Sequence, residues 1–110
     1  MNPHVELGNR IGQKGIGSHL RGPDQLVISD ANPARPDSNC FWVTQREGEW
    51  YIGTWLPAAY HVPANEDICH VCELVFRSSD KAIYTIDSAL MIRLGLRRLS
   101  DTEMEAAGFA

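Results

Sequence analysis

The stretch CFWVTQREGEWYIGTW at residues 40–55 predicts an antiparallel β-hairpin. Its two aromatic-rich runs are separated by Glu47-Gly48, and a two-residue loop is the spacing that tight hairpins use. This loop pairs four sets of residues across the hairpin: Arg46 with Glu49, Thr44 with Tyr51, Val43 with Ile52, and Trp42 with Gly53. Opposite charges then meet beside the turn, and a large ring lies over a bare glycine backbone.

The residues after the hairpin predict one amphipathic helix over about 65–78. Asn65 is a suitable N-cap, and the two acidic residues that follow it suit the positive end of the helix dipole. Apolar side chains recur at the i, i+3, i+4, i+7, i+8 spacing of a helix face, at Ile68, Val71, Cys72, Val75 and Phe76. A strand is the alternative, but the periodicity and the cap favour a helix whose apolar side packs on one hairpin face.

Further elements flank these two. Two short C-terminal helices are indicated, one from Asp87 through Leu94 and one that begins with the capping box Ser100-Asp101-Thr102-Glu103. Residues 26–29 could form an edge strand, residues 56–63 an extended connection or edge strand, and residues 82–86 another strand. We therefore predict an α+β fold: a small antiparallel sheet of three or four strands centred on hairpin 40–55, with the helix of about 65–78 packed on one face.

Residues 1–25 contain five glycines and few large apolar side chains. Ordering such a backbone costs conformational entropy that little burial offsets, so we expect a flexible Gly-rich N-terminal segment. The run from Gly12 to Gly17 lacks the preceding strand and following helix that a phosphate-binding loop needs. Residues 26–110 are then predicted to form a single α+β domain.

Composition limits the classes of function. The chain has 110 residues, a net charge of −4 and no apolar run long enough to span a membrane, so we expect neither nucleic-acid nor membrane binding. Three cysteines, an odd number, do not suit a secreted disulfide framework, and the N-terminus does not read as a secretory signal. These features indicate a cytoplasmic protein.

The motif Cys69-His70-Val71-Cys72 is the one metal-like or redox-like signal. A second pair of ligands is missing, and Cys72 falls on the apolar helix face, so core packing is the favoured interpretation. The alternative is a small zinc or thiol-redox site built on Cys69 and Cys72. We assign no metal ligand and no cofactor.

The hairpin carries the strongest functional signal. Side chains alternate between the two faces of a strand, so those of Cys40, Trp42, Tyr51 and Trp55 all lie on the face opposite the predicted core. Arg46 lies on the same face near the turn. The chain's own loops or C-terminal helices could cover this face. The functional interpretation is a non-catalytic binding or protein-interaction module that uses the aromatic hairpin face.

The predicted binding residues are Trp42, Tyr51, Trp55 and Arg46. Their partner is an unidentified protein or small molecule, with a homodimer left open. We predict no catalytic residue, since His61 is the one histidine whose surroundings suggest a general base and no second catalytic group can be placed beside it.

Overall fold

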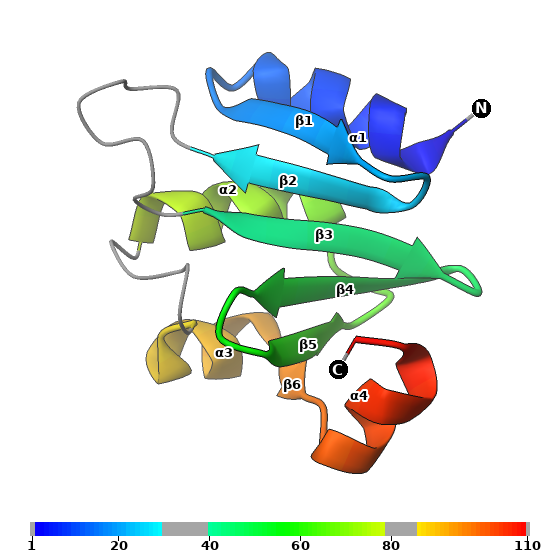
Figure 1. Cartoon of the computed structure of the whole chain (residues 1–110). Coiled ribbons are helices and arrows are strands. Elements are labelled where there is room, and N and C mark those ends of the chain that lie inside the picture. Colours follow the sequence, from blue (N-terminus) through cyan, green and yellow to red (C-terminus); the bar gives the residue numbers. More distant parts are fainter. Residues whose placement is uncertain (1, 30–39, 79–85, 110) are drawn as a thin grey trace.

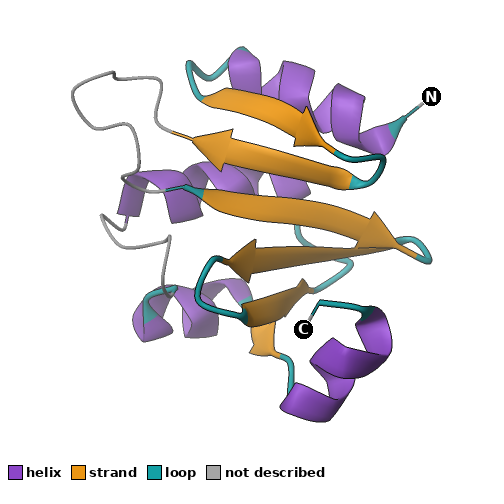
Figure 2. Cartoon of the chain, viewed as in Figure 1, coloured by secondary structure: helices purple, strands orange, loops and turns teal. Residues whose placement is uncertain are grey.

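The computed structural model describes residues 2–29, 40–78 and 86–109. Among these residues it has an α+β architecture, with a six-stranded antiparallel sheet in the order β1-β2-β3-β4-β5-β6 and four helices (Figures 1 and 2). The elements are α1 (Pro3–Gly12), β1 (Gly17–Arg21), β2 (Gln25–Ser29), β3 (Phe41–Arg46), β4 (Glu49–Thr54), β5 (Ala58–Val62), α2 (Ile68–Ser78), α3 (Ser88–Leu94), β6 (Arg97–Arg98) and α4 (Asp101–Ala107).

The β3–β4 hairpin forms in the predicted register. Arg46 pairs with Glu49, Thr44 with Tyr51, Val43 with Ile52, and Trp42 with Gly53. The two loop residues explain why the register is so well determined. Glu47 and Gly48 both have positive φ, at 52° and 78°, which is the conformation that matches a two-residue turn to the right-handed twist of the strands.

The sheet is larger than the predicted three or four strands. The run at residues 26–29 is not at an edge, because β2 pairs with β1 on one side and with β3 on the other. The proline-bounded stretch 56–63 contains β5, which pairs with β4 and with the two-residue β6. The predicted strand at 82–86 lies outside the described residues, apart from Ile86.

The N-terminal segment, predicted to be flexible, contains two regular elements that the sequence analysis did not predict, α1 and β1. Asn2 caps α1 with Pro3 in the first turn, and His4, Leu7 and Ile11 are buried. These positions are spaced i, i+3 and i+7, so their side chains lie on one helix face. The glycine content obscured this stripe, which contributes the burial that offsets the entropy cost of ordering the segment.

Helix α2 confirms the predicted helix but begins at Ile68, three residues after the predicted cap. The Asp67 carboxylate accepts a hydrogen bond from the Cys69 backbone N–H at 3.2 Å, so Asp67 and not Asn65 satisfies the first turn. The two predicted C-terminal helices form: α3 is capped by Asp87 at its start and by Gly95 at its end, and α4 is capped by Ser100 and Gly108.

Helices α1 and α2 cover one face of the sheet, and α4 lies on the opposite face beside β4 to β6 (Figure 1). The main core lies under α1 and α2 and includes Phe41, Val43 and Ile52 of the hairpin and Val71 and Val75 of α2. The apolar side of α2 therefore packs on one hairpin face, as predicted. A second cluster lies under α4 and consists of Val27, Trp42, Ala59, Leu99 and Met104, with Cys40, Tyr51 and Phe109 packed around it. Both faces of the hairpin are therefore packed.

Among the helices that the structure describes, none has the length and apolar character needed to cross a membrane.

Candidate functional site

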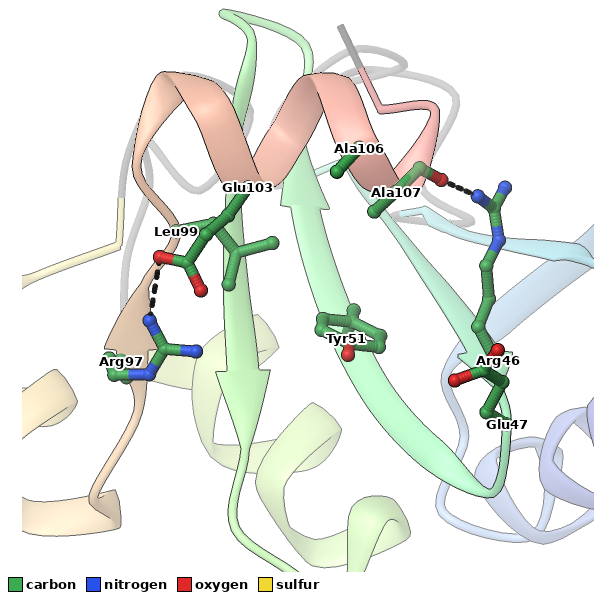
Figure 3. A pocket seen from close by; sticks show the side chains of 8 residues that line it. All are labelled: Arg46, Glu47, Tyr51, Arg97, Leu99, Glu103, Ala106 and Ala107. Atoms are coloured by element: carbon green, nitrogen blue, oxygen red, sulfur yellow. Dashed lines mark hydrogen bonds and ion pairs between the residues drawn. The ribbon is translucent and has the colours of Figure 1, made fainter.

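A groove lies between α4 and the turn end of the β3–β4 hairpin (Figure 3). Its volume is about 420 Å³. We call it the C-terminal groove, and it is lined by Arg46, Glu47, Tyr51, Arg97, Leu99, Glu103, Ala106 and Ala107. The lining comes from three parts of the chain that only the fold brings together: the hairpin, β6 with the residues after it, and α4.

Arg46 closes one end of the C-terminal groove. Its guanidinium donates a hydrogen bond to the backbone carbonyl of Ala107, near the end of α4. It also forms an ion pair with Asp24 at 3.4 Å, and its Cζ atom lies 4.6 Å from the centre of the Phe109 ring. Arg46 thus connects the hairpin to the C-terminal segment through a hydrogen bond and a cation–π contact.

The opposite end is formed by Arg97 and Glu103, whose side chains are joined at 2.9 Å. Glu103 also accepts the Ser100 backbone N–H at 3.1 Å, and Ser100 in turn accepts the Glu103 N–H, which completes the capping box of α4. The Arg97 guanidinium and then the Ser100 N–H lower the pKa of Glu103 to about 2. Glu103 is therefore a carboxylate at any physiological pH, and it orients Arg97 along the groove.

Tyr51 forms the floor. Its ring is half-buried, with the His61 ring 5.5 Å away on one side and the Phe109 ring 5.3 Å away on the other. His61 itself is held by Glu49, 2.9 Å from its Nε2 atom. Within the described part of the chain the Tyr51 hydroxyl has no hydrogen-bond partner. A hydroxyl can donate one hydrogen bond and accept two, so this group is free to bind a ligand.

The four residues predicted from the sequence do not form one surface. Tyr51 and Arg46 line the C-terminal groove. Trp42 is only 7% exposed, because Phe109 packs on it at 5.2 Å and its ring lies over Gly53. Trp55 is 37% exposed and stands outside the groove, where the Arg21 guanidinium lies 5.1 Å from its ring centre.

Six lining residues were not predicted as site residues from the sequence: Glu47, Arg97, Leu99, Glu103, Ala106 and Ala107. The capping box at Ser100 and Glu103 signalled that a helix would form there. Nothing in its local sequence indicated which sheet face the helix would cover, since that depends on contacts between residues far apart in the chain.

Cys69 and Cys72 lie in the main core, at 2% and 0% exposure. Burial raises the pKa of both thiols, which disfavours the reactive thiolate. Within the described ranges, no three His, Cys, Asp or Glu side chains are placed to hold a metal ion together. The geometry of this motif is that of packing residues.

Comparison of the chain with protein-family models, with curated proteins and with solved structures finds no significant match.

Proposed function

We propose that the protein is a small non-catalytic binding or protein-interaction module and that the C-terminal groove on the aromatic face of the hairpin is its ligand site. The observation that carries this proposal is the Tyr51 hydroxyl on the floor of a groove of about 420 Å³, which has no hydrogen-bond partner among the described residues. Ligand pockets of this size combine apolar walls with a few convergent polar groups, and the lining of this groove has both.

The charges of the groove favour a ligand without a large net charge. Arg46 and Glu47 lie at one end, and Arg97 and Glu103 at the other, so each end offers one group of each sign. Apolar contacts come from Leu99 and from the two alanines of α4.

A short peptide segment suits this distribution, because its backbone presents donors and acceptors in alternation. Its carbonyl groups can accept hydrogen bonds from the Tyr51 hydroxyl and the Arg97 guanidinium. Its N–H groups can donate to the carboxylates of Glu47 and Glu103, while small apolar side chains contact Leu99.

The test uses the full-length, ¹⁵N-labelled protein titrated with a pool of capped tripeptides that contain no aromatic residue. We expect backbone shift changes that concentrate on the groove residues and saturate at millimolar peptide. Tyr51→Phe removes one neutral hydrogen bond of about 0.5–1.5 kcal/mol, so affinity should fall by roughly 2- to 10-fold. A titration that moves no groove resonance, or a Tyr51→Phe variant with unchanged affinity, contradicts the proposal.

Ile92→Ala supplies the matched control. Ile92 lies on α3, is 82% exposed and does not line the groove. This substitution should leave both the fold and the peptide affinity unchanged.

A further inference from the structure

Phe109 occupies a cage made by three side chains of the hairpin. Its ring centre lies 5.2 Å from that of Trp42, 5.3 Å from that of Tyr51, and 4.6 Å from the Arg46 guanidinium carbon. We call Trp42, Tyr51 and Arg46 the Phe109 cage. Two ring contacts and a cation–π contact make the cage selective for an aromatic side chain over an aliphatic one.

Besides the hydrogen bond from Arg46 to the Ala107 carbonyl, the helix that carries Phe109 to the cage has few fixed contacts. Helix α4 has seven residues, fewer than an isolated helix needs for stability in water. Of the α4 residues, all of which the structure describes, Met104 is the buried one. The Arg97–Glu103 pair that fastens the start of the helix is solvent-exposed, and such pairs contribute little.

Two hollows border the end of this segment. The C-terminal groove reaches Ala106 and Ala107. A second hollow of about 150 Å³ is lined by Asp24, Gln25, Trp42, Thr44, Arg46, Gly108 and Phe109. The Phe109 ring is therefore held by the cage, and the backbone around it borders two hollows.

We propose that Phe109 is an internal competitor for a partner, and that the partner is a peptide segment with an aromatic side chain. This inference rests on the proposed binding function and adds its specificity and its regulation. When the end of α4 moves off the hairpin, the cage becomes vacant and takes the partner's aromatic ring, and the partner's backbone takes the place of the displaced segment along the hairpin side of the C-terminal groove. Because only open molecules bind, the apparent affinity equals the affinity of the open state multiplied by the fraction of molecules that are open.

The probe is a synthetic peptide that copies residues 101–109, with both ends capped. It is titrated onto the full-length wild-type protein and onto Phe109→Ala, with the Trp42 indole N–H resonance as the readout. We expect at least tenfold tighter binding to Phe109→Ala than to the wild type. A peptide with leucine in place of the phenylalanine should bind about tenfold more weakly.

Removing a phenylalanine leaves a hole that an aromatic ring could fill in any protein, so a second variant keeps the ring in place. Ser100→Ala breaks the capping box of α4 and so destabilises the closed state. The stability that an N-cap contributes corresponds to about a fivefold increase in the ratio of open to closed molecules. Peptide affinity should rise about fivefold in Ser100→Ala and stay unchanged in Ile92→Ala. If Phe109→Ala does not fold, Ser100→Ala decides the question alone.

Two outcomes overturn the inference: no binding of the 101–109 peptide to a folded Phe109→Ala protein, or equal affinity of Ser100→Ala and wild type. Failure of the groove proposal looks different. If non-aromatic tripeptides shift the groove residues while the 101–109 peptide binds no variant, only the competitor inference falls. If the 101–109 peptide binds Phe109→Ala while the tripeptides shift no groove residue, the groove proposal falls and the cage is supported.

Discussion

At the scale of single residues, the contact between Trp42 and Gly53 determines how the second face of the hairpin packs. A Cβ atom added at Gly53 would lie 1.7 Å from Cζ2 of Trp42, far closer than any real contact. Glycine is therefore required at this position for the Trp42 ring to lie flat on β4. The ring in turn presents the surface on which Phe109 packs.

Gly53→Ala should destabilise the protein by about 1–3 kcal/mol or more, because the ring must leave its position and overpacking costs that much. Urea unfolding followed by circular dichroism measures the change. Gly12→Ala is the control, since among the described residues a Cβ there would have no atom within 4 Å beyond its chain neighbours and its own helix backbone, and alanine favours a helix over glycine. Equal stability of Gly53→Ala and wild type would mean that Trp42 does not lie over β4.

His4 is a second residue with a specific role. Its Nε2 atom accepts the backbone N–H of Gln45 at 3.0 Å, and its Nδ1 atom lies 3.2 Å from the Asn2 side-chain oxygen. The Gln45 N–H can only donate, so Nε2 must be unprotonated and Nδ1 carries the hydrogen. The Trp50 ring packs edge-on at 5.5 Å. His4 thus fastens α1 to β3 in its neutral form.

Burial lowers the pKa of His4 below its ordinary 6.5, with Asp24 as a weaker opposing influence. The unfolded chain therefore takes up this proton at higher pH than the folded chain does. The contribution of His4 to stability is complete above pH 6.5 and is lost as pH falls through the lower, folded-state pKa.

This predicts a larger loss of stability between pH 7.5 and pH 5 in the wild type than in His4→Gln, which keeps an acceptor but does not titrate. Urea unfolding at the two pH values gives the difference, and the other histidines cancel in it. If the free energy of unfolding depended on pH identically in the two proteins, His4 would not stabilise the fold through its neutral form.

At the scale of elements, the start of α2 depends on one carboxylate. Asp67 accepts the Cys69 N–H and also pairs with Arg10 of α1 at 2.8 Å, whereas Asn65 lies two residues before the cap. The hydrogen bond from Arg10 is the main cause of the lowered pKa of Asp67, so the cap remains ionised down to acidic pH.

Asp67→Ala should therefore cost about 1 kcal/mol in the free energy of unfolding, as loss of an N-cap does, and Asn65→Ala should cost less than about 0.5 kcal/mol. Thermal or urea unfolding of the two variants side by side distinguishes them. The reverse order would place the helix start at the position that the sequence indicated.

How far each element could be predicted follows from how local its determinants are. The hairpin register was predictable because Glu47 and Gly48 fix it within two residues. The start of α2 was not, since Asn65 and Asp67 are both good caps and Arg10, distant in sequence, favours the second. Helix α1 was missed although Asn2 as cap and the His4, Leu7, Ile11 stripe were visible in the sequence.

At the scale of the whole molecule, the chain covers its own aromatic surface. The sequence alone showed three aromatic residues on the second hairpin face but could not show what covers them. The structure places Phe109 over Trp42 and beside Tyr51, and leaves Trp55 outside this packing. The candidate site could not be predicted because three of its eight lining residues belong to α4, whose docking depends on long-range contacts.

The packing of the C-terminal segment on the hairpin is the claim on which both proposals depend, and quenching of Trp42 fluorescence tests it directly. Trp42 is isolated in a Trp50→Phe, Trp55→Phe protein and its quenching by acrylamide is measured with and without Phe109→Ala. We predict low quenching while Phe109 is present, consistent with 7% exposure, and a clear increase after its removal. Two results would contradict the account. One is that Trp42 is quenched as strongly as free tryptophan while Phe109 is present, and the other is that Phe109→Ala leaves the quenching of Trp42 unchanged.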